Sequence, residues 1–187
     1  GGDPTVTNPG GGNTSVKRRL SDFRGREVQV LTVKASGADL ATAGPSHFAD
    51  LFLDDLSPLA SREAMSDEVM VDYLRHCLLD PAAPRPSIET LLHAFLPAPH
   101  VDHVHPDVAC AFANARGGQE ALSELFGEEA GWVPYVRPGF GLARLAIETF
   151  RGRPKARFLV LQKHGLVTWA GDARSCYLQT VEFIGKG

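Results

Sequence analysis

The feature that most constrains the fold is an alternation along the chain between short apolar segments and longer segments with helical periodicity. In REVQVLTVKASG, apolar side chains gather before the Ser36-Gly37 turn, which predicts a strand. Residues 66–79 instead place their apolar side chains on one stripe, which predicts a helix with Ser66 as its N-cap. This alternation predicts an α/β domain built in layers.

The rest of the chain continues the pattern, except at its start. HVDHVH, ended by Pro106, predicts a short strand that leads into a helix. GGDPTVTNPGGGNTSVKRRL, residues 1–20, is dense in Gly, Asn, Thr and Ser and predicts a loop. The further predicted elements are a helix at 88–95 with Ser87 as its N-cap, helices near 117–126 and 141–151, two strands within 157–170, and a last helix over 172–184.

Length, charge and cysteine content limit the classes of function. A chain of 187 residues, 43% of them hydrophobic, suits one globular domain, and a net charge of -3 gives no strong field for nucleic acid or for an anionic membrane. No apolar run could span a bilayer and no signal peptide is visible. Cys77, Cys110 and Cys176 form no closed disulfide framework, which favours a reducing cytoplasm, and we expect Cys77 and Cys176 in the core. The chain opens without Met and ends in what resembles a helix cut short, so we expect a single domain over 1–187, truncated at both ends.

Two histidines one residue apart, His103 and His105, are the first candidates for a metal site. Residues two apart in a strand point to the same face, so both imidazoles can reach one ion, although a solvated polar turn is the alternative. His164 follows the apolar segment FLVLQK and adds a third candidate, and three histidines leave the open coordination position of a catalytic zinc site. Three other histidines lack a neighbouring strand or turn of this kind and are expected at the surface or in helices: His47, His76 and His100.

Glu89 is the candidate general base, because it opens the predicted helix at 88–95 shortly before the histidine pair. A carboxylate beside a divalent cation stays ionised and can remove a proton from a carbonyl compound. The alternative is a first-turn glutamate that only interacts with the helix dipole. Glu89 and His93 lie four residues apart, so they can also act together.

Three turns rich in Gly, Ser and Asn could together hold a phosphate through backbone N–H groups, hydroxyls and an amide. They are GGGNTS at 10–15, ASG at 35–37 and RPS at 85–87, and Lys34 could add charge. Taken singly, each is most often only a turn. GGGNTS lacks the ending of a P-loop, and GFG at 139–141 lacks the third glycine of a dinucleotide fingerprint.

In this order, GGGNTSVK, VKASG, RPSIETLLH, HVDHVHPD and LQKHGL resemble the motifs of the class II aldolase/adducin family. The similarity covers nearly the whole chain, and five ordered motifs are specific where one alone would be weak. Within the family, the chain resembles the aldolase part of bifunctional rhamnulose-1-phosphate aldolase/alcohol dehydrogenase proteins, and it resembles fuculose-1-phosphate aldolase more distantly. The resemblance implies a three-layer α/β/α domain around a mostly antiparallel sheet, commonly in a homotetramer with active sites near subunit boundaries.

The resemblance also implies roles for single residues. Glu89 would be the catalytic acid/base, and Tyr135 is the nearest candidate for the aldehyde-side proton donor, although no motif assigns it. The ligands of a divalent metal, zinc first and otherwise manganese or cobalt, would be His103, His105 and His164. The residues that bind the substrate phosphate would be Gly12, Asn13, Ser36, Gly37 and Ser87.

The implied reaction is the reversible cleavage of a ketose 1-phosphate, of the rhamnulose or fuculose type, to dihydroxyacetone phosphate and an aldehyde. One alternative is a pentulose-phosphate 4-epimerase or a sugar-phosphate dehydratase on the same scaffold, and another is an adducin-like interaction domain without catalysis. Epimerases usually carry Asp at the position of Glu89, and the interaction domains typically lose the histidines, so the residues favour an aldolase. Ile88, where simpler aldolases often have a second Ser, and the short connection from Glu89 to His103 depart from those relatives.

Overall fold

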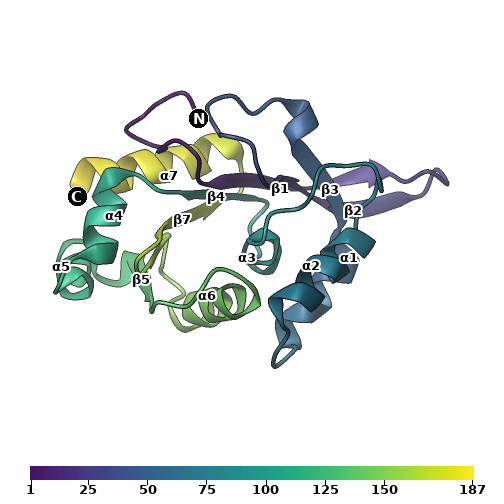
Figure 1. Cartoon of the computed structure of the whole chain (residues 1–187). Helices are drawn as coiled ribbons and strands as arrows, with labels where there is room; N and C mark the ends of the chain where they lie inside the picture. The colour runs from purple at the N-terminus through teal and green to yellow at the C-terminus, as the bar shows by residue number, and fades with distance from the viewer.

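A sheet of seven strands forms the centre of the computed structural model, which describes all residues, 1–187 (Figure 1). The strands lie in the order β3-β2-β1-β4-β7-β6-β5, and all neighbours are antiparallel except β5 and β6. The prediction of a mostly antiparallel sheet is therefore confirmed. The strands are β1 (Asn13–Ser21), β2 (Glu27–Lys34), β3 (Phe48–Phe52), β4 (His100–Val104), β5 (Ala130–Val133), β6 (Phe158–Leu161) and β7 (Gly165–Ala170).

Seven α-helices cover this sheet, and short 3-10 turns at Pro45–His47, Ser57–Ser61 and Gly127–Glu129 connect some of the elements. The helices are α1 (Leu53–Leu56), α2 (Asp67–His76), α3 (Thr90–Phe95), α4 (Asp107–Asn114), α5 (Gly118–Phe126), α6 (Phe140–Gly152) and α7 (Ala173–Lys186). None of the helices is long and apolar enough to cross a membrane.

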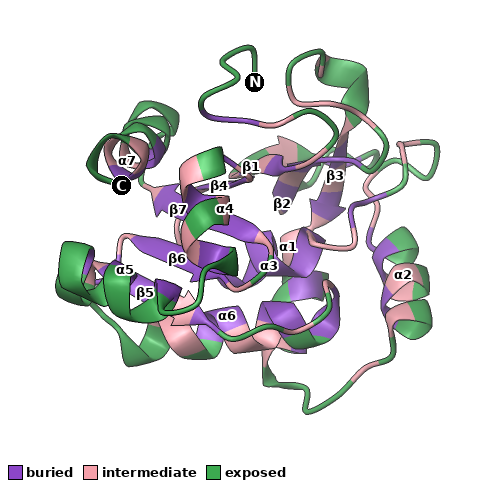
Figure 2. Cartoon of the chain, turned by 60° about the vertical axis from the view of Figure 1, so that its left-hand side comes forward, coloured by how far each residue is buried: buried purple, intermediate pink, exposed green.

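The two faces of the sheet carry separate cores, and strand β6 shows how one strand serves both. Leu159 and Leu161 pack with α1, α2, α3 and α6, whereas Phe158 and Val160 point to α4, α5 and α7. In Figure 2 the buried strands lie between helices whose outer faces are exposed. This arrangement confirms the predicted three-layer α/β/α fold.

The prediction of a loop over residues 1–20 is wrong for its second half, because β1 begins at Asn13 and pairs with both β2 and β4. The strand was not predicted because most of its side chains are polar. Asn13 and Ser15 are buried, and each has a polar partner inside the protein, Ser87 and His93 respectively. Strands β3 and β5, short and without a strong pattern, were also missed.

The helix predicted at 88–95 exists, but it begins at Thr90 and its N-cap residue is Glu89. Ser87 instead accepts a hydrogen bond from the Glu89 backbone N–H at its side chain, 3.2 Å away, and one from Thr90 at its carbonyl. The helix predicted at 66–79 is confirmed as α2, with Ser66 as its N-cap. Cys77 and Cys176 are buried, as expected.

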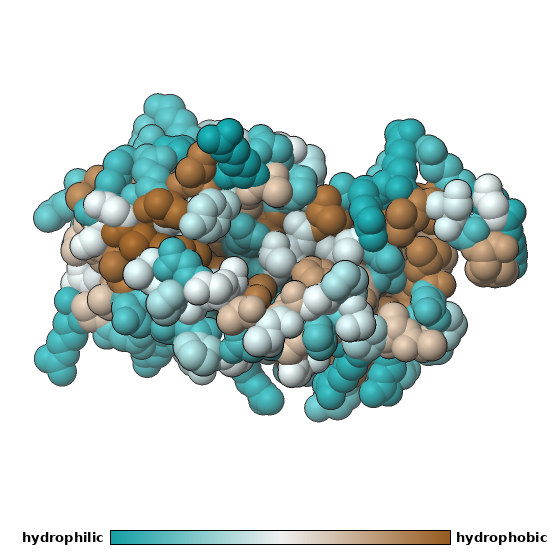
Figure 3. All heavy atoms as spheres, turned by 90° about the horizontal axis from the view of Figure 1, so that it is seen from above, coloured by the Kyte–Doolittle hydropathy of each residue, from teal (hydrophilic) through white to brown (hydrophobic).

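The outer surface of the protein is mostly hydrophilic on the face shown in Figure 3, where hydrophobic side chains gather in separate patches. Helix α7 contributes three of the exposed large hydrophobic residues, Tyr177, Leu178 and Val181. An exposed apolar face of this kind is a candidate surface for contacts between subunits.

Candidate metal centre

His103 lies at the middle of the sheet, on β4, where its backbone pairs with Asn13 of β1 and Val167 of β7. The side chain is fully buried, on the face that packs against α3. Its Nδ1 donates a hydrogen bond to the Leu166 carbonyl at 3.1 Å, which sets the tautomer and leaves Nε2 directed into the site. A histidine that binds a metal through one ring nitrogen typically donates a hydrogen bond from the other ring nitrogen, as His103 does here.

The Nε2 atoms of the three candidate histidines converge. His103 Nε2 lies 3.0 Å from His105 Nε2 and 3.2 Å from His164 Nε2, and the three ligand atoms all lie within 4.8 Å of one another. Nitrogens that bind one tetrahedral zinc at about 2.0–2.1 Å lie about 3.3–3.4 Å apart. Burial and the neighbouring imidazoles lower the pKa of His105 to about 4, so its ring is a neutral ligand at pH 7. The donor set therefore fits a divalent metal.

Gly165 lets the rings pack this closely. A Cβ at this position would lie 2.6 Å from the Val104 carbonyl oxygen and closer still to the His105 ring. Gly11 has a similar role on the other side, because a Cβ there would overlap the same ring. This steric limit is the reason why a glycine follows His164. Lys163, which precedes the pair, adopts a positive φ of 58° in the tight turn between β6 and β7.

Glu89 joins the histidines from the start of α3. Its Oε1 lies 3.0 Å from His164 Nε2 and 3.3 Å from His103 Nε2, and its side chain is only 10% exposed. Burial alone would raise the pKa of Glu89, but the two imidazoles hold it well below its usual range, so the carboxylate is ionised. Burial lowers the pKa of His103, but the Glu89 carboxylate raises it, and the net result is a raised pKa. A metal cation would replace the proton that the carboxylate favours on this ring.

The His93 ring forms no hydrogen bond or ion pair with the Glu89 carboxylate, so the structure gives no direct contact through which the two could act together. The ring is completely buried one turn further along α3, and Nδ1 lies 2.8 Å from Ser15 Oγ. Burial lowers the pKa of His93 to about 3, so the ring is neutral. His47 and His76 are exposed and His100 is half-buried at the start of β4, and none of the three belongs to the cluster of His103, His105 and His164.

A pocket of about 460 Å³ opens beside this centre. Glu89 and His105 form one part of its wall, and Lys34 forms another. Two turns reach it through glycines with positive φ, Gly12 at 81° and Gly37 at 89°. The structure thus brings together around one pocket all five residues predicted to bind phosphate: Gly12, Asn13, Ser36, Gly37 and Ser87.

The sequence did not indicate every residue of the pocket. Asp39 ties two of the turns together, because its carboxylate accepts backbone hydrogen bonds from Gly10 at 2.6 Å and Ala41 at 2.7 Å. Asp39 lies two residues after the ASG turn, but a single aspartate there carries no signal of this long-range contact. Tyr135 does not line the pocket; it is 54% exposed and lies 5.4 Å from the Lys163 ammonium.

The fold agrees with comparisons to known proteins. Residues 3–184 match the family described as "Class II Aldolase and Adducin N-terminal domain". The chain therefore belongs to the class II aldolase/adducin family.

The chain is similar to one curated protein and to two solved structures. The chain is 51% identical over 184 residues to "Uncharacterized oxidoreductase YuxG" of Bacillus subtilis (strain 168), and the match covers 98% of this chain but 27% of that protein. It resembles the N-terminal class II aldolase domain of a conserved protein from Thermoplasma acidophilum, with 37% identity, a TM-score of 0.88, and coverage of 95% and 82%. The L-fuculose-1-phosphate aldolase of Thermus thermophilus shares the fold at 17% identity, with a TM-score of 0.59 and coverage of 96% and 81%.

Proposed function

We propose that the chain is a metal-dependent aldolase that reversibly cleaves a ketose 1-phosphate, of the rhamnulose or fuculose type, to dihydroxyacetone phosphate and an aldehyde. One observation carries the proposal: Glu89 Oε1 lies within 3.3 Å of two of the three convergent imidazoles. Glu89 lies at the wall of a pocket that is lined by turns rich in Gly and Ser. A base beside a cation site, with room for a phosphate ester, is the set of groups that this reaction needs.

His103, His105 and His164 would hold the ion, and zinc suits the nitrogen donor set, with manganese or cobalt as alternatives. A bound divalent ion would supply Lewis-acid stabilisation of the negative charge that develops on the substrate oxygens. The Leu166 carbonyl keeps the His103 ring in the orientation that this requires.

Glu89 would move the proton. In the addition direction its carboxylate would take a proton from the carbon next to the carbonyl of dihydroxyacetone phosphate, and in the cleavage direction the carboxylic acid would return it to that carbon. The ionised state of Glu89 in the structure suits the first of these roles. The turns at Gly12-Asn13 and Ser36-Gly37, together with Ser87, would bind the phosphate through backbone N–H groups and hydroxyls.

The test combines metal content with cleavage of rhamnulose 1-phosphate and fuculose 1-phosphate, followed as release of dihydroxyacetone phosphate. We expect release that stops on chelation and returns with zinc or manganese. One metal per chain without cleavage of either sugar would reject the aldolase in favour of an epimerase or a dehydratase. A chain that binds no metal would leave only a non-catalytic interaction domain.

A further inference from the structure

Glu89 lies at the N-cap of α3, a helix that is buried along its whole length. All six residues of the helix, Thr90–Phe95, are buried. A helix this short is not stable alone, so the protein around it must hold it in place. Apolar contacts on all sides are not directional, so they do not fix the rotation of the helix about its own axis. Another contact must therefore set the direction in which Glu89 points.

Two polar side chains of β1, Ser15 and Lys17, hold this helix. They are two residues apart in the strand, so they point to the same face of the sheet. Ser15 Oγ lies 2.8 Å from His93 Nδ1, and both side chains are buried. Lys17 Nζ donates a hydrogen bond to the His93 carbonyl at 3.0 Å. It also donates to the carbonyls of Leu96 and of Ala98, the latter at 2.8 Å, where the chain leaves the helix.

His93 connects these contacts to Glu89. Its backbone N–H donates a hydrogen bond to the Glu89 carbonyl at 3.4 Å, so the two residues are neighbours on one face of the helix. A ring that is fixed to β1 therefore fixes the rotation of the turn that carries the carboxylate. Glu89 Oε1 lies within 3.3 Å of both His103 Nε2 and His164 Nε2. A displacement of about 1 Å in such a group can cost about 100-fold in rate.

The Ser15–His93 pair has a cost that stability of the fold does not require. Two apolar side chains could fill the same space, whereas burial removes both polar groups from water. The ring is also not fully satisfied, because His93 Nε2 is buried without a hydrogen-bond partner. Buried polar pairs can fix one arrangement among several that apolar packing allows. The pair therefore suits a role in orientation.

We propose that Ser15 and His93 are positioning residues that hold the Glu89 carboxylate against the two imidazoles, while Lys17 anchors the far end of the same helix. Neither Ser15 nor His93 lines the pocket, so both act through α3. The inference rests on the proposed function for its consequence, which is that a displaced Glu89 transfers protons more slowly.

Proton transfer can be measured on its own, as deuterium exchange from D2O into dihydroxyacetone phosphate with the zinc-loaded chain and no aldehyde. The decisive comparison is between His93→Leu and His93→Asn. These two side chains have the same shape, but only the amide can form a hydrogen bond with Ser15 from the place of Nδ1. We expect exchange to be about 10- to 100-fold slower in His93→Leu, with KM and bound zinc unchanged, and to return to near the wild-type rate in His93→Asn. Equal rates in the two variants would overturn the inference.

Ser15→Ala removes the same hydrogen bond with a smaller change, and it replaces His93→Leu if that variant does not fold. We expect it to slow exchange as much as His93→Leu does, and the double variant to be no slower than either single one. Thr180→Val is the matched control, because it removes a buried contact of the same length, 2.8 Å, between α7 and Thr168 of β7. The control should melt at a lower temperature without slower exchange. Slowing as large as in Ser15→Ala would overturn the inference, since any lost buried hydrogen bond would then have this effect.

Crystal structures of the metal-free variants keep this inference separate from the proposed function. We expect Glu89 Oε1 to leave contact with His103 and His164 in His93→Leu and to keep its wild-type distances in His93→Asn. A wild-type chain that exchanges no deuterium would reject the aldolase, and displacement of Glu89 in His93→Leu would still support the positioning role. Glu89 in its wild-type place in His93→Leu would overturn the inference and leave the aldolase.

Discussion

At the scale of single residues, Glu89 and His103 touch one another but would have different roles. The Glu89 carboxylate contacts the Nε2 atoms of His103 and His164. The three histidines form the ligand set without it. We expect Glu89→Gln to retain the metal and to lose about 10²- to 10⁴-fold in turnover, because the amide cannot accept the proton. His103→Ala should lose both metal and turnover. Metal analysis and release of dihydroxyacetone phosphate check both variants, and full activity in Glu89→Gln would refute the assignment.

Gly165 permits a second test at this scale. Gly165→Ala would force its methyl group against the His105 ring and the Val104 carbonyl. We expect metal affinity to fall about 10- to 100-fold and stability to fall by about 1–3 kcal/mol from overpacking. Gly171→Ala, at a position where a Cβ meets no atom within 4 Å, is the matched control in metal titration and thermal melts. Equal metal affinity in the two variants would contradict the steric role.

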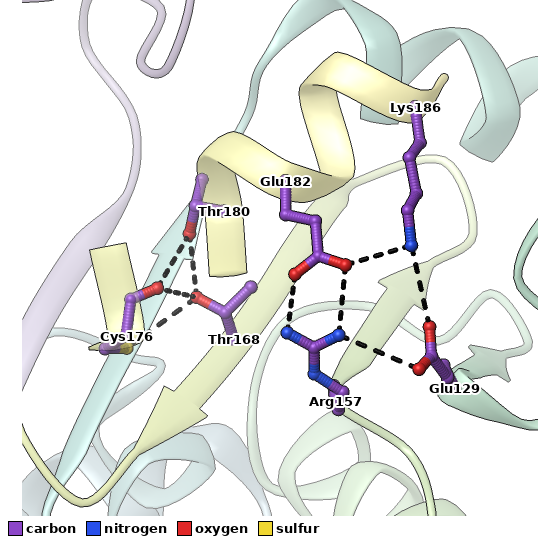
Figure 4. Close-up of polar contacts among 7 residues, drawn as sticks. All are labelled: Glu129, Arg157, Thr168, Cys176, Thr180, Glu182 and Lys186. Atoms are coloured by element: carbon purple, nitrogen blue, oxygen red, sulfur yellow. Dashed lines mark hydrogen bonds and ion pairs between the residues drawn. The ribbon is translucent and has the colours of Figure 1, made fainter. Parts of the chain in front are cut away.

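At the scale of elements, helix α7 is attached to the sheet by an ion-pair network (Figure 4). Arg157 binds both carboxylate oxygens of Glu182, at 3.0 and 2.6 Å, and Lys186 binds Glu182 at 2.9 Å. Hydrogen bonds from these two cations lower the pKa of Glu182 to about 2. The same helix also packs through a hydroxyl contact of 2.8 Å between Thr180 and Thr168 of β7.

This network predicts a pH dependence of stability. Because the folded pKa of Glu182 is lowered from 4.5, its contribution is present above about pH 4.5 and is lost as the pH falls toward about 2. Both partners are about one-third exposed, so we expect Glu182→Gln to cost only about 0.5–1 kcal/mol at pH 7. Urea unfolding at pH 7 and at pH 3 should show a smaller difference from the wild type at the lower pH. Glu124→Gln, on the exposed face of α5 and without an ion pair, is the control, and a difference that grows with acid would contradict the sign.

At the scale of the whole molecule, the resemblance to class II aldolases predicts a homotetramer with its site near a subunit boundary. The exposed Tyr177, Leu178 and Val181 of α7 offer an apolar surface that such contacts could cover. Light scattering on the eluting protein should give four times the mass of the chain, 20.1 kDa. A mass equal to one chain, at concentrations where cleavage is measured, would contradict the tetramer.

Local patterns in the sequence determined much of the fold. Helical periodicity identified α2, α5, α6 and α7, and apolar runs identified β2, β6 and β7. The two-residue spacing of His103 and His105 was enough to suggest a shared ligand face, because the direction of side chains along a strand is set by the backbone. Gly37 and Gly12 were recognised as turns because their surroundings are rich in Gly, Ser and Asn.

Only the tertiary structure decided the remaining features, because they depend on contacts between residues distant in sequence. Strand β1 is polar, and its membership of the sheet follows from pairing on both sides and from buried partners such as Ser87 and His93. The meeting of Glu89 with His103 and His164 requires α3, β4 and the β6–β7 turn to lie together. The burial of Lys34 at the pocket wall likewise follows only from folding, because nothing in its local sequence indicates a buried lysine.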